Sequence, residues 1–388
     1  MFSCRPLVCV ETSKVNRVMI HFRTDREHGG NVHQVAAQFG LALQDVLDFS
    51  ANINPAGLPE RAAQRLIRDA GDRALLKQYP DPASTELRLA LSRKLQVRPE
   101  SIVIGGGSTA LIIATIRALA PRTCLCPVPA FSEYQAACEA TQCQFVPFPL
   151  EEKGAFRPDM EELSRYLSEE EFDAVILNNP HNPSGAVLEA SWLRQLVTTA
   201  QKRGTTVILD EAFVDYVPEV SLTADAGERP ALVVIRSLTK FYGCPALRIG
   251  YAVTSATFAE HIKLQLPTWP VTTLAVNVLT EALNDEEYAQ ATLHENDHER
   301  LYLAAAFQQL GLQVFPSAAN FLLLKLPSGA PSSGHLRMEL LERHRILVRN
   351  CDSFEGLEKG RFLRVAILGR SENERLVAAL GSLLRGPG

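Results

Sequence analysis

Residues 174–185 read AVILNNPHNPSG, and this stretch decides the fold class. Its first four residues form a continuous apolar run, which is typical of a β-strand buried on both faces. Two X-Pro steps follow, at Pro180 and Pro183, and the residue before each proline is held extended. A strand ending in such a loop favours a parallel α/β sheet, where ligands bind beyond the carboxyl ends of the strands. A plain proline-rich turn is the competing interpretation of the loop alone.

Short apolar runs alternate with amphipathic stretches on both sides of this segment. Strands are predicted over Ser101–Gly105, Thr123–Pro127, Ala174–Leu177, Thr206–Leu209 and Leu232–Arg236. Helices are predicted over Thr109–Ala120, Ser132–Thr141 and Ser191–Arg203. Because strands that alternate with helices build βαβ units, we expect an α/β fold with a mostly parallel central sheet. This large domain is predicted to span residues 56–274.

The last part of the chain has a different pattern. One long helix is predicted from Ala275 to Leu310, followed by strands over Asn320–Lys325, Ile346–Arg349 and Phe362–Ala366 and helices over Leu336–Arg343 and Glu372–Leu384. This pattern predicts a smaller α+β domain over residues 275–388. Residues 1–55 carry little strand signal, and we expect this N-terminal segment to pack across a cleft, on the small domain and the active site.

Composition excludes several classes of protein. The chain has 388 residues and a net charge of −5, so it lacks the basic surface of a nucleic-acid binder. No apolar run approaches the roughly 20 residues that span a membrane. The first 20 residues do not resemble a signal peptide, and Met19 is a second candidate start. The eight cysteines form neither a CxxC pair nor a zinc-like spacing, so we expect a soluble cytoplasmic protein without a metal.

Two short motifs offer polar groups at predicted strand ends. Gly105-Gly106-Gly107-Ser108-Thr109 lies between a strand and a helix, where glycines and free helical N–H groups can bind a phosphate. A tight turn with a serine or threonine cap is the alternative. In the loop after residue 177, Asn182 offers both a donor and an acceptor.

Two further residues carry the chemistry. Asp210 directly follows the strand at Thr206–Leu209, where a carboxylate is costly to bury unless it is paired, and a protonated ring nitrogen suits it. Capping of the next helix is the alternative role. Lys240 follows Ser237 and Thr239, and a lysine amine can form an imine with a carbonyl cofactor. A solvated surface charge is the alternative for this lysine.

In this order, the four features resemble the fold-type-I pyridoxal-phosphate enzymes of the class I/II aminotransferase family. The resemblance implies that Lys240 holds the cofactor as a Schiff base, that Asp210 pairs with its pyridine nitrogen, and that Asn182 binds its 3′-oxygen. It implies that the cofactor phosphate is held by Ser108, Thr109, Ser237 and Arg248, with Thr239 also among the cofactor-binding residues.

Three aromatic positions belong to the same resemblance. Phe131 matches the residue that stacks on the cofactor ring, with Tyr134 as the alternative. Tyr79 resembles the tyrosine that reaches the cofactor phosphate of a neighbouring subunit, so a homodimer is implied. Phe213 departs from the pattern, because many aminotransferases have a tyrosine there and a phenyl ring cannot donate a hydrogen bond.

The N-terminal segment narrows the reaction. The motifs HGGN (residues 28–31) and DFSANINP (residues 48–55) together resemble the threonine-phosphate decarboxylases, which are close to the histidinol-phosphate aminotransferases. Gly29 and Gly30 expose backbone N–H groups that can wrap an anion, and His28 can add a donor. A flexible glycine turn is the alternative.

Two arginines in the C-terminal part, Arg349 and Arg364, suit a substrate that carries both a carboxylate and a phosphate. The resemblance implies that Arg364 binds the α-carboxylate and Arg349 the phosphate, with Asn52 and Asn182 also contacting substrate. Surface ion pairs are the alternative for both arginines.

The resemblance therefore implies decarboxylation of O-phospho-L-threonine to (R)-1-amino-2-propanol O-2-phosphate and CO2, a step of cobalamin biosynthesis. The nearest alternative is a histidinol-phosphate aminotransferase that transfers an amino group to 2-oxoglutarate. The choice depends on which bond of the substrate Cα stands perpendicular to the cofactor ring. A cofactor-free nucleotide-binding module or an inactive scaffold is the alternative from another class. We expect neither nucleic acid nor a membrane as a partner.

Overall fold

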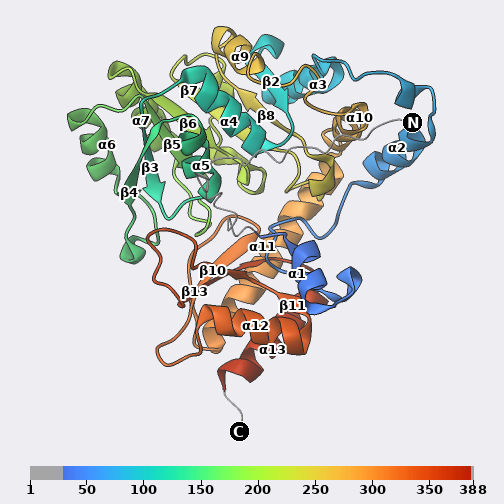
Figure 1. Cartoon of the computed structure of the whole chain (residues 1–388), viewed down its shortest axis with the longest axis vertical. Coiled ribbons are helices and arrows are strands. Elements are labelled where there is room, and N and C mark those ends of the chain that lie inside the picture. The colour runs from blue at the N-terminus through green and yellow to red at the C-terminus, as the bar shows by residue number, and fades with distance from the viewer. Residues whose placement is uncertain (1–28, 386–388) are drawn as a thin grey trace, which may run out of the picture.

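The computed structural model describes residues 29–385. The predictions made for the start of the chain and for His28 therefore lie outside the described residues. Of the three sheets in the described residues, the two larger ones lie in two parts of the molecule. The long helix α11 (Glu286–Gln309) runs from one part to the other (Figure 1). Within residues 29–385 no helix is both long and apolar enough to cross a membrane.

The large sheet has seven strands in the order β2-β8-β7-β6-β5-β3-β4. Their bounds are β2 Ile102–Gly105, β3 Thr123–Val128, β4 Gln144–Pro149, β5 Ala174–Asn178, β6 Thr206–Asp210, β7 Leu232–Ser237 and β8 Gly250–Val253. Only β8 runs antiparallel to its neighbours, β2 and β7. The prediction of an α/β fold with a mostly parallel central sheet is therefore confirmed.

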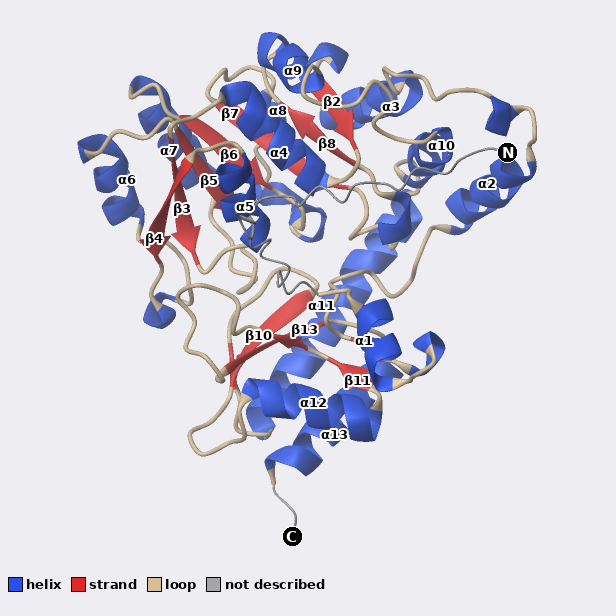
Figure 2. Ribbon diagram, in the orientation of Figure 1, coloured by secondary structure: helices blue, strands red, loops and turns tan. Residues whose placement is uncertain are grey.

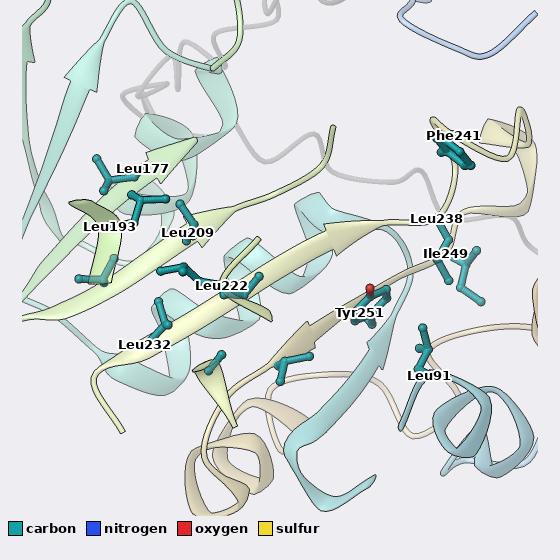
Figure 3. Packing of buried hydrophobic residues seen from close by; sticks show 14 of the residues in the cluster. Leu91, Leu177, Leu193, Leu209, Leu222, Leu232, Leu238, Phe241, Ile249 and Tyr251 are labelled. Atoms are coloured by element: carbon teal, nitrogen blue, oxygen red, sulfur yellow. The ribbon is translucent and has the colours of Figure 1, made fainter. Parts of the chain in front are cut away.

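Helices cover both faces of this sheet (Figure 2), which explains why its strands are continuously apolar. Along β5, Val175 and Leu177 belong to one core and Ile176 to the other, because successive side chains point to opposite faces. The first core includes residues from α2 (Glu60–Gly71), α3 (Thr85–Leu95), α6 (Met160–Glu169), α7 (Ala190–Lys202), α8 (Thr223–Ala226) and α10 (Thr273–Ala282). Figure 3 shows part of it, with Leu91 of α3 and Leu193 of α7 labelled. The second includes residues from α4 (Ser108–Leu119), α5 (Ser132–Ala140) and α9 (Ala256–Lys263).

The small sheet has four antiparallel strands in the order β12-β13-β10-β9. Its strands are β9 Gln313–Val314, β10 Phe321–Lys325, β12 Arg349–Asn350 and β13 Phe362–Ala366, and it packs with α11, α12 (Ser333–His344) and α13 (Arg370–Leu384). The N-terminal segment joins this part through α1 (Val32–Phe39) and through β1 (Leu47–Asp48), which pairs parallel with β11 (Ile346–Leu347). The predicted domain limits at residues 55 and 274 stay predictions.

Two predicted elements differ in the structure. The single helix expected over residues 275–310 is interrupted at residues 283–285, where α10 ends and α11 begins. Asp285 causes the new start, because its carboxylate accepts a hydrogen bond from Tyr288 N at 2.9 Å and caps α11. The strand expected over Ile346–Arg349 is divided between β11 and β12, which pair in different sheets.

Candidate active site

A cavity of about 440 Å³ lies beyond the carboxyl ends of β5, β6 and β7 and reaches β12 and β13 of the small sheet. The structure brings most of the predicted site residues to its wall. These are Gly29, Asn52, Ser108, Thr109, Phe131, Tyr134, Asn182, Asp210, Ser237, Thr239, Lys240, Arg248, Arg349 and Arg364.

Two of the predicted residues that the structure describes, Tyr79 and Gly30, do not line this cavity. Tyr79 is 77% exposed and stacks on Trp269, with ring centroids 4.3 Å apart. Gly30 donates its N–H to Ser50 Oγ at 3.0 Å, and its predicted role in binding an anion stays a prediction. His28 lies outside the described residues.

Lys240 follows β7, and the N-terminal segment fixes the backbone around it. Asn54 N donates to the Lys240 carbonyl oxygen at 3.0 Å, and Asn54 Nδ2 donates to the Phe241 carbonyl oxygen at 2.8 Å. Burial, helped by the charges of Arg248 and Arg364, lowers the pKa of Lys240 to about 8. An amine with such a pKa has a substantial neutral fraction near pH 8, and the neutral form is the one that attacks a carbonyl.

Asp210 ends β6 as a carboxylate that is only 3% exposed. Tyr134 Oη donates to its Oδ2 at 2.7 Å, and Ala212 N donates to its Oδ1 at 3.0 Å. Burial nevertheless raises the pKa of Asp210 to about 6. A buried carboxylate of this kind is stabilised by a cationic partner in the cavity.

The family resemblance makes Tyr134 the alternative to Phe131 for stacking on a cofactor ring, but the geometry of Tyr134 favours a different role. Its side chain is 1% exposed, and its hydroxyl is engaged by Asp210. Its ring meets Phe131 edge to face, with centroids 5.6 Å apart and planes at 85°. Phe131 therefore remains the better candidate for stacking on a planar ligand, and Tyr134 fits the support of Asp210.

The N-terminus of α4 gathers donors that could hold an anion. Ser108 and Thr109 open the helix, whose first N–H groups have no intrahelical partner. Gly107 precedes them with φ +92°, and a Cβ placed on it would lie 2.7 Å from Arg248 Nη2. Glycine at this position lets the guanidinium approach the helix start. The hydroxyls of Ser237 and Thr239, 2.8 Å apart, line the same cavity.

The NNPHNPSG loop joins the two parts of the site. Asn178 Nδ2 donates to the Asp210 carbonyl oxygen at 2.8 Å, and Asn178 Oδ1 accepts from Asn182 N at 2.7 Å. Asn182 Oδ1 accepts from Arg364 Nη1 at 2.6 Å. Within the loop, burial lowers the pKa of His181 to about 4, and its ring bonds Ser184 Oγ and the Pro129 carbonyl oxygen. A neutral His181 therefore braces the loop, whose amides position Asn182.

Arg349 and Arg364 lie directly opposite each other on β12 and β13, and each is 6% exposed. Besides Asn182, Arg364 donates from Nη2 to the Ser50 carbonyl oxygen at 3.0 Å. Burial lowers the pKa of Arg364 to about 10, and the charge of Arg349 contributes to that shift. Since two cations are held on one face of the small sheet, this wall of the cavity suits a ligand with two anionic groups.

Several residues of the cavity were not assigned a role from the sequence. Ser50 and Asn178 belong to the DFSANINP and NNPHNPSG motifs, so a sequence signal exists for them, whereas Ser353 and Phe354 come from a loop without any motif. Ala51, Ala130, Ser132, Glu133 and Ala212 complete this group.

The residues present fit a planar, phosphorylated cofactor with a carbonyl group and a basic ring nitrogen. Lys240 supplies the amine, Asp210 the partner for a protonated ring nitrogen, Phe131 an aromatic face, and the start of α4 a phosphate cradle. Asn52 Oδ1 and Arg364 Nε are buried and have no hydrogen-bond partner among the described residues, as expected for atoms that bind a ligand.

Comparisons with known proteins agree with this geometry. Residues 44–380 match the model of a family described as aminotransferase class I and II. The threonine-phosphate decarboxylase of Salmonella typhimurium is 36% identical over 363 residues, which cover 92% of this chain and 97% of that protein. The adenosylcobalamin biosynthesis bifunctional protein CobDQ of Leptospira interrogans is 32% identical over 93% of this chain, which spans 41% of that longer protein.

Among solved structures, the histidinol-phosphate aminotransferase from Clostridium acetobutylicum superposes with a TM-score of 0.81. It is 27% identical in sequence, and the match covers 88% of this chain and 100% of that one. The fold is therefore shared with both the decarboxylase and the aminotransferase branches.

Proposed function

This chain belongs to the aminotransferase class I and II family, and from that premise we propose that it decarboxylates O-phospho-L-threonine with pyridoxal phosphate held at Lys240. The products are (R)-1-amino-2-propanol O-2-phosphate and CO2. The relationship to a bifunctional protein of adenosylcobalamin biosynthesis supports a place in the cobalamin pathway.

The observation that carries the proposal is the pair of buried arginines, neighbours across β12 and β13, that line the same cavity as Lys240. O-phospho-L-threonine has two anionic groups, an α-carboxylate and a phosphate, and each requires a charged donor. Arg364, fixed by Asn182 and the Ser50 carbonyl oxygen, is proposed to bind the carboxylate. Arg349, opposite it on β12, is proposed to bind the phosphate.

Bound pyridoxal phosphate supplies an electron sink for the charge left at Cα when CO2 departs. The chain's own residues prepare this chemistry. Asp210 would stabilise a positive charge at the ring nitrogen, the start of α4 would hold the cofactor phosphate, and Phe131 would restrain the ring. Arg364 would orient the substrate carboxylate that leaves as CO2. Lys240 then delivers a proton from its Nζ to Cα.

The alternative, a histidinol-phosphate aminotransferase, shares the fold but is the more distant match, at 27% identity against 36%. Phe213 also weighs against it, because this ring cannot donate a hydrogen bond and packs edge to face on Phe321 with centroids 5.0 Å apart.

The test is a product assay. Purified protein with pyridoxal phosphate is incubated with O-phospho-L-threonine, and CO2 and the phosphorylated amine are measured together. We expect both products in equal amounts and little amino transfer to 2-oxoglutarate. Rapid transamination without CO2 would overturn the proposal. Lys240→Ala is the control. It should lose both turnover and the visible absorbance band of the imine between Lys240 and pyridoxal phosphate. A band that is present in wild type and absent in this variant also excludes a cofactor-free scaffold.

We further propose that the protein works as a cytoplasmic homodimer. Tyr79 and Trp269 form an aromatic stack that is 77% and 46% exposed, respectively, so a second copy has an apolar surface to cover. Tyr79 would then contact the cofactor phosphate of the other subunit. Light scattering should give twice the 42.7 kDa of one chain.

A further inference from the structure

The loop between β12 and β13 contributes two residues to the cavity, Ser353 and Phe354. Both contact Arg349. Arg349 Nη2 donates to Ser353 Oγ at 2.6 Å. The guanidinium carbon of Arg349 lies 5.5 Å from the centroid of the Phe354 ring.

These two contacts constrain Arg349 differently. An aromatic ring against a guanidinium restricts its plane and provides a cation–π attraction. Because arginine has donors and no acceptor, Ser353 Oγ is the acceptor of this hydrogen bond. The hydroxyl proton of Ser353 therefore points away from Arg349 and can be donated to an anion that Arg349 binds.

The loop itself is anchored by a different residue. Asp352 Oδ1 accepts hydrogen bonds from Gly360 N at 2.7 Å and from Ser333 Oγ at 3.2 Å. Phe354 N also bonds the Cys351 carbonyl oxygen at 3.0 Å. The loop is therefore held without the side chain of Ser353, whose position at the cavity wall calls for another explanation.

We propose that Ser353 and Phe354 complete a phosphate subsite around Arg349 and so determine specificity for a phosphorylated substrate. Ser353 donates a second hydrogen bond to the substrate phosphate, next to the bond from Arg349. Phe354 is a positioning residue that fixes the guanidinium plane. A phosphate monoester carries a charge between −1.5 and −2 and three acceptor oxygens, so it engages two adjacent donors where a carboxylate at Arg364 uses one fork.

This inference rests on the proposed function, and its test separates the two. The probes are O-phosphoethanolamine and ethanolamine, an amine pair that differs only in the phosphate and has no carboxylate to lose. Their dissociation constants are measured by absorbance titration of the pyridoxal-phosphate-loaded protein. The variants are Ser353→Ala and Phe354→Leu, with Ser333→Ala as the matched control that removes a serine hydroxyl from the loop anchor outside the cavity.

We expect Ser353→Ala to raise the dissociation constant of O-phosphoethanolamine about tenfold, which is the effect of losing one hydrogen bond to a charged group. The dissociation constant of ethanolamine should change by less than about twofold. Phe354→Leu should likewise weaken the binding of O-phosphoethanolamine more than the binding of ethanolamine. In Ser353→Ala the KM for O-phospho-L-threonine should rise in parallel, while kcat stays within about twofold. This pattern is expected because the phosphate is bound equally in the substrate complex and in the transition state.

Two results would overturn the inference alone: unchanged O-phosphoethanolamine binding in Ser353→Ala, or an equal loss in Ser333→Ala, which would assign the effect to loop displacement. A wild-type protein that binds both probes equally would instead overturn the proposed function, because no phosphate subsite would then exist.

Discussion

Asp210 is a carboxylate in surroundings that oppose its charge. Its side chain is buried, and the Tyr134 hydroxyl is the neutral donor that stabilises the ionised form at Oδ2. Tyr134 is thus a positioning residue that acts through Asp210 on any cation in the cavity. This role is distinct from stacking, which needs the face of a ring rather than its hydroxyl.

Tyr134→Phe tests that role. Loss of the donor should raise the pKa of Asp210 further above about 6, so less of it is ionised at neutral pH. We expect pyridoxal phosphate to bind about tenfold more weakly, for a lost hydrogen bond of about 1.5 kcal/mol to a charged group, with a larger loss at pH 6 than at pH 8. Fluorescence titration of the apoprotein measures this. Tyr166→Phe on α6 is the matched control, and equal affinities from pH 6 to pH 8 would contradict the role.

Residues next to strand ends could be assigned from the sequence, because a strand end is locally encoded. Asp210 and Lys240 each follow a continuous apolar run, and the cavity contains both. Ser353 could not be assigned, because its contact with Arg349 depends on how a loop without a motif folds back. The hydrogen bond between Arg364 and Asn182 could not be predicted either, because the two residues are 182 positions apart and only the tertiary structure brings them together.

At the scale of elements, the sequence predicted five strands of the large sheet and missed two, β4 and β8. Strands β5, β6 and β7 lie in the middle of the sheet, so their residues are apolar on both faces. Strand β4 was not predicted, since it lies at the sheet edge, is partly exposed and contains Pro147 and Pro149. Strand β8 is short and antiparallel, which a pattern of parallel βαβ units does not suggest.

The interruption between α10 and α11 was missed because the helical pattern continues across it while the cap signal is short. Asp285 is followed by Glu286 and Glu287 in the first turn, an arrangement that favours a new helix start. Asp285→Ala should therefore lower the free energy of unfolding by about 1 kcal/mol. Asp285→Asn should keep most of this stabilisation, because an asparagine side chain can also cap the helix. Urea unfolding measures the stability of both variants. If Asp285→Asn lost as much stability as Asp285→Ala, capping by the side chain would be ruled out as the cause of the loss.

At the scale of the whole molecule, the site exists only where three distant segments meet. Asn54 ties the N-terminal segment to the Lys240 loop and, through Tyr288 and Thr292, to α11. The large sheet supplies Lys240 and Asp210, while the small sheet supplies both arginines. Binding of a ligand that contacts both sheets would therefore stabilise their relative placement.

Asp210 should accordingly lower the stability of the whole apoprotein in a pH-dependent way. Its pKa in the fold, about 6, lies above the ordinary 3.8, so ionisation is penalised in the folded state by a cost on the order of 3 kcal/mol. Below about pH 4 the group is protonated in both the folded and unfolded states, and this cost vanishes. It develops as pH rises from about 4 to 6 and is fully present above that range.

Asp210→Asn removes the ionisable group while keeping its shape. We expect the apoprotein of this variant to melt at a higher temperature than wild type at pH 8, with a difference that shrinks toward zero as pH falls through 6 toward 4. With pyridoxal phosphate the order should reverse, because only the carboxylate gains a cationic partner and ligand binding adds to stability. Melting curves with and without the cofactor at pH 5, 6, 7 and 8 measure both effects. A wild-type apoprotein that is the more stable of the two at pH 8 would show that Asp210 is already compensated by its neighbours, and its burial could then not be ascribed to binding a cation.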